Sequence, residues 1–402
     1  MIKSIKIDNF KSLVEFECPL AKFNCLIGLN GAGKSTILQA MDFLSQLMVG
    51  DIDEWLEQRS WKKADINSKL TPKSNIDFEV VVDHPSWGEI IWEGSVNRTK
   101  LTCTRESIRI GEHTVLNVLD GTVTVSSPDS TESLDQVESI SEIRQLSDVR
   151  REERFPIVFE YQGSIISQLK ASQITTPMAA VRDQMLAMKS LDLLSPSALR
   201  KKSRSSDKDM GLGGEKLSAF LYEMTTENKR ALLERLEKLY PALLSLKTSS
   251  LKAGWKQLSI TEQYNNTKLT SEARHINDGM LRVMAIIAQT LTGHTFLLFD
   301  EIENGINPEL VERVVQWLVD APQQIMVTTH SPMILNYLDD ETAKAGVLLV
   351  YKTSQGFTKV TPFFRIPDME AKLRTMGPGE VFVDTDLIAL AEQIANSVDT
   401  KG

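Results

Sequence analysis

The sequence predicts an α/β fold that carries an antiparallel β subdomain and an inserted helical subdomain. Three observations predict it. A short apolar strand runs into a glycine-rich loop and a helix near the amino terminus, short alternating strands follow, and buried strands alternate with helices in the last third. Because 402 residues are too many for one small core, we expect an amino-terminal lobe over 1–160, a helical insertion over 161–250 and a carboxyl-terminal lobe over 251–402.

The composition is that of a globular protein of the cytoplasm. Hydrophobic residues make up 42% and charged residues 25% of the chain, and no apolar run approaches the ~20 residues that span a membrane. The net charge of -9 disfavours a protein that coats DNA, although it leaves room for a local basic surface. Cys18, Cys25 and Cys103 lack metal-ligand spacing, which predicts buried thiols in a reducing compartment.

The first 50 residues predict strand, loop and helix in succession. Residues 2–7 alternate apolar and polar side chains, as a half-exposed strand does, and residues 23–28 form a short apolar strand. After the loop, apolar side chains recur at helical spacing. These are Ile37, Leu38, Met41, Leu44 and Leu47.

In the middle of the chain the pattern of apolar and polar side chains changes twice. Residues 76–126 hold short β-rich segments between turn signals, which indicates an antiparallel meander. The polar stretch 127–154 predicts a surface helix or a linker. A largely helical stretch is expected over 164–247, interrupted by an exposed loop at 200–214.

The last third predicts a buried parallel sheet. The segments 294–301 and 323–331 are apolar along their length, which is typical of strands buried on both faces. Between them lies an amphipathic helix, and residues 346–363 predict a hairpin.

Residues 28–35, "GLNGAGKS", fit the pattern of a phosphate-binding loop. Glycines allow backbone N–H groups to turn toward phosphate oxygens, and the helix that follows adds its positive end. Lys34 would neutralise the phosphates, and the Ser35 hydroxyl would ligate Mg²⁺. The alternative is a glycine turn of purely structural value, which the flanking strand and helix disfavour.

Two buried strands end in side chains suited to phosphate chemistry. Asp300 and Glu301 close one strand, and His330 closes the next. Asp300 would hold Mg²⁺ through water, and Glu301 would act as the general base on the attacking water. His330 would contact the γ-phosphate or that water. The alternative for all three is a solvated strand end.

The order of these parts resembles the RecF/SMC-like branch of the ABC-type ATPases. "IDNFKSL", the phosphate loop, "NDGMLR", "LLFDEIENGINP" and "TTHSP" follow one another as in that branch, and the resemblance covers about residues 1–50 and 270–365. It is similar in layout to stand-alone bacterial RecF-like and OLD-type AAA-family ATPases, including those of anti-phage defence. The resemblance implies an ABC-type P-loop head that binds ATP and Mg²⁺.

The resemblance also implies roles for individual residues. Asn277, Asp278 and Gly279 stand at the signature motif, where they would contact the γ-phosphate held by a second subunit, and Asn277 replaces the usual serine. Gln162 is the candidate for an additional Mg²⁺ ligand. The residues expected to bind the nucleotide are Asn9, Phe10, Lys11, Ser12, Asn30, Gly31, Ala32, Gly33, Lys34, Ser35 and Thr36.

The resemblance implies a homodimer closed around ATP, which could assemble further. About 70 residues follow the last motif and hold no acidic cluster beyond Asp384 and Asp386, so we expect a separate effector, a nuclease or a toxin, and not a built-in nuclease. The alternatives are a RecF-like DNA-binding clamp and a switch that does not hydrolyse ATP.

Nucleic acid is a possible partner. Lys201, Lys202 and Arg204 form a small basic loop that either contacts nucleic acid or is simply solvated. The sequence around this loop shows no interleaved aromatic residue, which favours the solvated loop.

Overall fold

The computed structural model describes residues 1–128, 150–191 and 194–399. The polar stretch expected to be a helix or linker lies mostly outside the described residues. The chain divides into two compact units. Unit 1 comprises Met1–Met188, Lys344–Pro367 and Thr385–Gly402, and unit 2 comprises Lys189–Ala343 and Asp368–Asp384.

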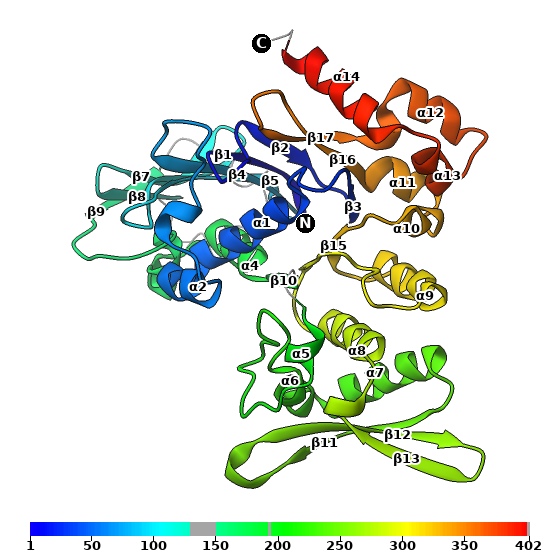
Figure 1. The fold of residues 1–402 in the computed structure, drawn as a ribbon. Helices are drawn as coiled ribbons and strands as arrows, with labels where there is room; N and C mark the ends of the chain where they lie inside the picture. The colour runs from blue at the N-terminus through cyan, green and yellow to red at the C-terminus, as the bar shows by residue number, and fades with distance from the viewer. Residues whose placement is uncertain (129–149, 192–193, 400–402) are drawn as a thin grey trace. The chain divides into compact units, whose positions relative to one another are not determined.

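Unit 1 contains an eight-stranded antiparallel sheet (Figure 1). Its strand order is β2-β1-β4-β5-β6-β7-β8-β9. The meander predicted over 76–126 is confirmed, because β4 to β8 pair in chain order. The strands are β1 (Ile2–Asp8), β2 (Phe16–Pro19), β4 (Asn75–His84), β5 (Gly88–Asn97), β6 (Thr102–Ile110), β7 (His113–Leu119), β8 (Thr122–Pro128) and β9 (Arg150–Pro156).

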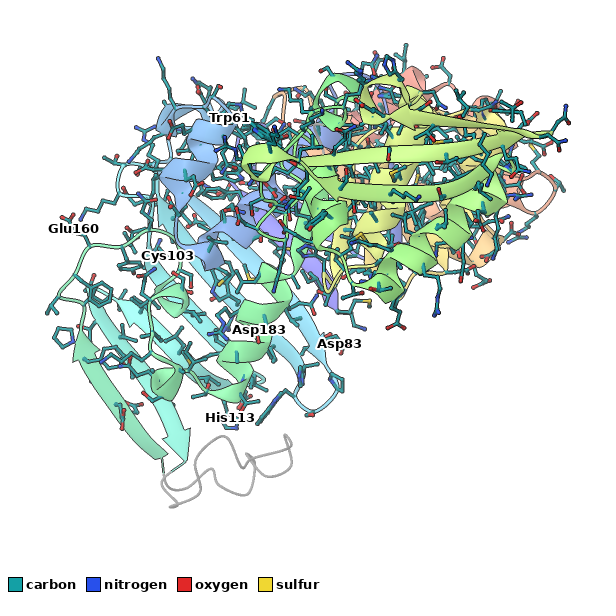
Figure 2. The ribbon with its side chains drawn as sticks, turned by 90° about the horizontal axis from the view of Figure 1, so that it is seen from below. Trp61, Asp83, Cys103, His113, Glu160 and Asp183 are labelled. Carbon is teal, nitrogen blue, oxygen red and sulfur yellow. The ribbon has the colours of Figure 1, made fainter. Side chains whose placement is uncertain are left out.

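One face of this sheet is apolar and packs against helices. Along β4, Ile76, Phe78, Val80 and Val82 are buried, whereas the side chains between them are partly exposed. Phe43 of α1 (Lys34–Val49) lies 5.9 Å from Phe78, centroid to centroid. The helix α4 (Thr176–Leu186), which carries Asp183, crosses the strands in Figure 2 and contacts β4, β5 and β7. Alternating apolar side chains therefore decide which face receives the helices.

A buried carboxylate joins the sheet to the segment that follows it. The Glu106 side chain on β6 is 2% exposed and accepts hydrogen bonds from Trp92 Nε1 (2.8 Å), Ile165 N (2.9 Å) and the Ser164 hydroxyl. Burial raises the pKa of the Glu106 carboxyl, although these three donors act in the opposite direction. The Ser164 backbone N–H in turn donates to the Leu47 carbonyl of α1 (2.8 Å). Glu106 thus links the sheet to α1 through the loop around residue 164.

A second group of strands in unit 1 carries the phosphate loop. Strand β3 (Phe23–Ile27) pairs in parallel with β16 (Val347–Lys352), which forms the predicted hairpin with β17 (Thr358–Pro362). The other α-helices among the described residues of this unit are α2 (Ile52–Gln58) and α14 (Leu387–Asp399). Cys18, Cys25 and Cys103 are buried and form no disulfide bond, as predicted.

Unit 2 contains the second buried strand pair. Strands β14 (Phe296–Phe299) and β15 (Gln324–Thr328) run parallel, and every residue of both is buried, which confirms the expectation from their apolar runs. The helices of this unit, with those at its boundaries, are α5 (Pro196–Leu199), α6 (Leu217–Glu223), α7 (Thr226–Leu239), α8 (Asp278–Thr290), α9 (Pro308–Val319), α10 (Pro332–Asn336), α11 (Asp340–Gly346), α12 (Pro367–Leu373) and α13 (Pro378–Val383).

A three-stranded antiparallel sheet completes unit 2 (Figure 1). It consists of β11 (Leu243–Ser250), β12 (Lys256–Tyr264) and β13 (Thr267–Glu272), and α6 and α7 pack on it. The stretch 164–247 is less helical than expected, because it also holds β10 (Met188–Leu191) and the start of β11. Pro241, just after α7, prevents the helix from continuing into β11.

Within residues 1–128, 150–191 and 194–399, no helix combines the length and apolar character needed to cross a membrane.

Replacing Glu106 with alanine should lower the free energy of unfolding by about 2–4 kcal/mol, because it leaves three buried donors without their acceptor. Urea denaturation followed by circular dichroism measures the change. Glu89→Ala, at an exposed position on β5, is the matched control and should change stability little. Equal stability of the two variants would show that the Glu106 contacts do not stabilise the fold.

Candidate functional site

The phosphate loop leads from β3 into α1 and encloses the ammonium group of Lys34. Lys34 Nζ donates to the Gly28 carbonyl (2.9 Å) and to the Leu29 carbonyl (3.2 Å). The side chain is nearly buried, with 6% exposed. A positive charge is therefore held at the centre of the loop.

The loop is packed tightly on the β16–β17 hairpin. A Cβ atom on Gly28 would lie 2.3 Å from the Val350 carbonyl oxygen, and one on Gly33 would lie 2.3 Å from Thr358 Oγ1. Gly28 and Gly33 also have φ angles of 141° and 114°, which disfavour any side chain. The buried Thr358 hydroxyl donates to the Ala32 carbonyl (2.8 Å). Both glycines are thus required by close approach as well as by backbone conformation.

The start of α1 suits an anion. Gly33 caps this 16-residue helix in a left-handed conformation without a side-chain cap, and the first turn holds no acidic residue. The positive end of the helix dipole is therefore not offset by a carboxylate. A Cβ on Gly31 would meet nothing within 4 Å, so the loop has open space there. Ser35 and Thr36 lie half-buried in the first turn.

The loop also lines a cavity of about 470 Å³ in unit 1. Residues 29–32 form one wall, and β16 and α14 form the others. This volume is within the range of small-molecule sites, roughly 300–1,000 Å³. Lys34 and Ser35 do not line this cavity, so it lies beside the residues expected to bind phosphate. The loop conformation and the charge of Lys34 are the features that fit the phosphate groups of a nucleotide.

The motif after β1 is built into the fold. The Asn9 side chain is fully buried, donates to the carbonyls of Lys73 (2.9 Å) and Asn75 (2.7 Å), and accepts from the Thr71 hydroxyl (2.8 Å). Phe10 is also fully buried, 5.7 Å from the ring of Phe43. Asn9 and Phe10 are therefore placed to position this segment.

Lys11 and Ser12, in the same motif, make side-chain contacts with α1, Trp61 and the β16–β17 hairpin. Lys11 Nζ donates to Gln39 Oε1 (2.9 Å) and lies 3.3 Å from the centre of the Trp61 ring. The Ser12 hydroxyl hydrogen-bonds Thr358 Oγ1 (2.8 Å), whose hydroxyl also contacts the phosphate loop. Ser12 thereby reaches the loop through Thr358.

In unit 2, Asp300 and Glu301 stand at the carboxyl end of β14, and one threonine orients both. The Thr328 hydroxyl donates to Asp300 Oδ1 and accepts from the Glu301 N–H (2.9 Å). Glu301 has a φ of 46°, a left-handed conformation that costs on the order of 1 kcal/mol outside glycine. Its Oε2 accepts from Asn304 Nδ2 (3.1 Å). The Glu301 carboxylate is exposed and held in one position.

Arg282 holds the backbone of this acidic pair. The residue is 8% exposed and lies on α8, the helix that begins at the signature motif. Its Nη2 donates to the carbonyls of Asp300 and Glu301, both at 2.9 Å. Burial lowers the pKa of the guanidinium, and the carboxylates of Glu301, Asp300 and Glu303 oppose this effect. Arg282 thus connects the signature helix to the acidic pair.

His330 is exposed at the end of β15, and its backbone is anchored by Glu303. Glu303 Oε1 accepts from the His330 N–H (2.9 Å) and from the Thr329 hydroxyl (2.9 Å). Its Oε2 is buried and has no hydrogen-bond partner among the described residues. The Glu303 carboxylate therefore fixes the turn that presents His330.

The signature motif begins α8. Asn277 Oδ1 caps the helix by accepting from the Met280 N–H (2.7 Å), and Asp278 forms an ion pair with Arg200. Asn277 and Asp278 are exposed, and Gly279 is half-buried. Asparagine is as good a helix cap as serine, so the departure from the usual serine preserves the local structure.

Gln162 caps a different helix. Its Oε1 accepts from the backbone N–H groups of Ile52 (2.8 Å) and Asp53 (3.0 Å), and its Nε2 donates to Asp53 Oδ2 (2.6 Å). A metal-ligating role for Gln162 would require it to leave the start of α2.

Each unit brings some of the predicted residues together. In unit 1, Ser12 meets the loop that holds Lys34. In unit 2, Asp300 and Glu301 meet the signature helix through Arg282. Sequence patterns missed Thr328, Thr358, Arg282 and Glu303, although an arginine inside the apolar run "MLRVMAII" is a visible signal of a buried role.

The chain is similar to known proteins in family and in fold. The AAA ATPase domain family matches residues 1–335. The OLD nuclease of Thermus scotoductus is 33% identical over 108 residues. That match covers 26% of this chain and 18% of the nuclease, so it spans less than a fifth of the relative.

Two solved structures share the fold. An SMC head bound to the C-winged helix domain of ScpA aligns with a TM-score of 0.53 at 15% identity, over 90% of this chain and 97% of that chain. The SMC head with an extended coiled coil from Pyrococcus furiosus aligns with a TM-score of 0.51 at 14% identity, over 93% and 99%. The predicted P-loop head fold with an antiparallel β subdomain is confirmed. Since the family match covers most of the chain and includes the phosphate loop, this chain belongs to the AAA ATPase domain family.

Proposed function

We propose that this ATPase is a nucleotide-operated switch in which two copies close over two MgATP molecules and separate after hydrolysis. The observation that carries the proposal is the exposed signature motif on unit 2. Asn277 uses its Oδ1 as a helix cap, whereas its Nδ2 has no hydrogen-bond partner among the described residues. An exposed amide donor at a helix amino terminus suits the γ-phosphate held by a second copy.

The residues present also suit Mg²⁺ bound together with the nucleotide. The Ser35 hydroxyl and the Asp300 carboxylate are the hard oxygen ligands that Mg²⁺ prefers. In the described part of the chain, no group of three or more His, Cys, Asp or Glu side chains is gathered around a metal position. The ion would therefore depend on phosphate oxygens as well. When bound, Mg²⁺ supplies charge neutralisation at the phosphates.

We assign the chemical step to Glu301. Its carboxylate is exposed and accepts a hydrogen bond from Asn304, and Thr328 holds its backbone N–H. A fixed carboxylate is able to take the proton of an attacking water. Lys34 and the loop N–H groups would bind the phosphates, and His330 would contact the γ-phosphate.

We further propose that the switch controls a separate effector protein in anti-phage defence, in the cytoplasm. Two comparisons support a separate effector. A stretch of 108 residues of this chain is similar to part of an OLD nuclease, a protein named for nuclease activity. One SMC head of the same fold is bound to a domain of another protein, ScpA. Co-purification with the products of neighbouring genes, followed by mass measurement, would identify the effector.

Replacing Glu301 with glutamine should lower kcat for ATP at least about 100-fold while nucleotide affinity changes little, because the amide cannot accept the water's proton. Phosphate release measures the first quantity, and titration with a fluorescent ATP analogue measures the second. Glu309→Gln, at an exposed position on α9, is the matched control. An unchanged kcat in Glu301→Gln would remove this residue from the chemistry.

Replacing Arg282 with methionine should lower kcat about 10- to 100-fold, because the acidic pair loses the donor that fixes its backbone. Nucleotide affinity should hold, since the phosphate loop is in the other unit. Arg282→Lys should restore part of the rate. The control is Arg235→Met, which removes a hydrogen bond from α7 to Thr290 on α8, the helix that carries Arg282. If Arg282→Met lowers nucleotide affinity and kcat together, the arginine stabilises the fold and does not specifically position Asp300 and Glu301.

A further inference from the structure

A row of alternating basic and aromatic side chains crosses unit 2. The Arg204 guanidinium lies 5.0 Å from the Trp255 ring centre, and Lys256 Nζ lies 4.0 Å from the Tyr222 ring centre. Lys229 Nζ lies 5.5 Å from the same tyrosine ring. We call these five side chains the basic–aromatic row.

The fold assembles this row from three separate segments. The Lys256 N–H donates to the Ser203 carbonyl (2.7 Å), which ties the start of β12 to the loop 200–204. The Ser203 hydroxyl accepts from the Ala219 N–H of α6 (3.0 Å), the helix that carries Tyr222. Lys229 Nζ also donates to the Tyr222 carbonyl (2.7 Å). The basic loop therefore does have aromatic neighbours, contrary to the expectation from its local sequence.

Further cations flank the row. Lys201 and Lys202 are exposed beside Arg204, and Lys252 is exposed just before Trp255. Among the described residues, Lys201, Lys202, Arg204 and Lys252 form no ion pair. Their charge is thus available to a ligand.

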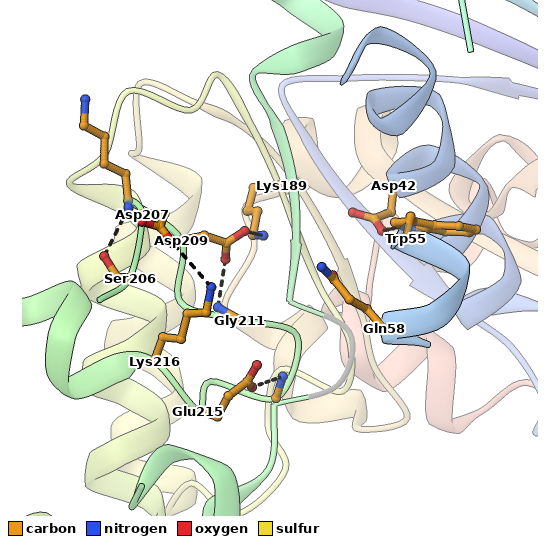
Figure 3. A network of polar contacts seen from close by, with 12 residues as sticks. Asp42, Trp55, Gln58, Lys189, Ser206, Asp207, Asp209, Gly211, Glu215 and Lys216 are labelled. Carbon is orange, nitrogen blue, oxygen red and sulfur yellow. Dashed lines mark hydrogen bonds and ion pairs between the residues drawn. The ribbon is translucent and has the colours of Figure 1, made fainter. Parts of the chain in front are cut away.

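The nearby acidic side chains are largely committed to other contacts. Glu223 binds the backbone N–H and the hydroxyl of Ser206. Asp209 pairs with Lys189 (2.6 Å) and accepts from the Gly211 N–H, and Asp207 faces Lys216, as Figure 3 shows. Glu227, in the first turn of α7, is exposed. The six cations named here (Lys201, Lys202, Arg204, Lys229, Lys252 and Lys256) therefore outnumber the acidic side chains named here without a cationic partner, Glu223 and Glu227.

We propose that the basic–aromatic row binds single-stranded nucleic acid. Its cations would contact successive phosphates, and Trp255 and Tyr222, 39% and 37% exposed, would stack on unpaired bases. Paired bases in a duplex do not offer their faces to these rings, and an acidic peptide has no bases to stack. The row lies in unit 2 and shares no residue with the phosphate loop in unit 1, so it adds a ligand to the proposed switch.

Fluorescence anisotropy with the full-length chain tests this site. Labelled oligo-dT and oligo-rU of about twelve nucleotides, within the range of single-strand binding sites, are compared with a duplex of equal length. Both single strands should bind more tightly than the duplex, and the affinity should fall as salt rises. Because thymine carries a methyl group that uracil lacks, oligo-dU is included, and a difference between oligo-dU and oligo-rU would identify the sugar that the surface prefers. Equal or tighter duplex binding would overturn the proposal.

Variants separate stacking from charge. Trp255→Leu should weaken single-strand binding about fivefold or more, whereas Trp255→Phe should keep most of it. Replacing Lys202 and Arg204 with glutamine should make the slope of log affinity against log salt shallower, by about 0.7 for each phosphate that is no longer neutralised. Arg98→Gln with Lys100→Gln, at exposed positions between β5 and β6 of unit 1, is the matched control and should have no effect.

Two results would contradict the site. If Trp255→Leu binds the single strand as tightly as wild type does, stacking on Trp255 is excluded. If polyglutamate competes as strongly as the unlabelled oligonucleotide does, the row is only a general anion-binding surface. ATP hydrolysis should be unchanged in each variant, which confirms folding. If Trp255→Leu does not fold, Tyr222→Leu makes the same test.

Discussion

The shape of the phosphate loop depends on its close packing against the hairpin from the other end of the chain. Val350 and Thr358 leave no room for side chains at Gly28 and Gly33, and the Thr358 hydroxyl bonds the loop carbonyl of Ala32. The loop N–H groups and the Lys34 ammonium are therefore arranged before any phosphate arrives. A preformed site of this kind loses little conformational entropy on binding.

The acidic pair in unit 2 is also held in place by its surroundings. There the contacts are buried hydrogen bonds, whereas the phosphate loop is held by close packing at its glycines. Thr328 orients Asp300 and the Glu301 backbone, while Arg282 bonds both of their carbonyls. Arg282 lies about one turn into α8, the helix that Asn277 caps. A shift of that helix would therefore move the donor that bonds the Glu301 carbonyl. This gives a physical route by which a second copy docking on the signature motif could influence hydrolysis.

Much of the fold and of the site could be predicted from the sequence, and the failures have a common cause. The loop, the acidic pair and the buried strands follow from local patterns, since spacing within a few residues defines them. Thr358, Thr328 and the basic–aromatic row could not be predicted, because their roles come from partners far away in the chain. Asn9 and Phe10 match a family motif, and their full burial, with Asn9 hydrogen-bonded to Lys73, Asn75 and Thr71, is a feature that spacing alone does not reveal.

The most direct test of the account is the mass of the Glu301→Gln chain in solution with saturating MgATP, measured by light scattering. If two copies share their nucleotides, the measured mass with ATP should be twice the 45.0 kDa of one chain. With ADP, the measured mass should be that of one chain. A mass of one chain in both nucleotides, with nucleotide binding demonstrated, would contradict the shared site.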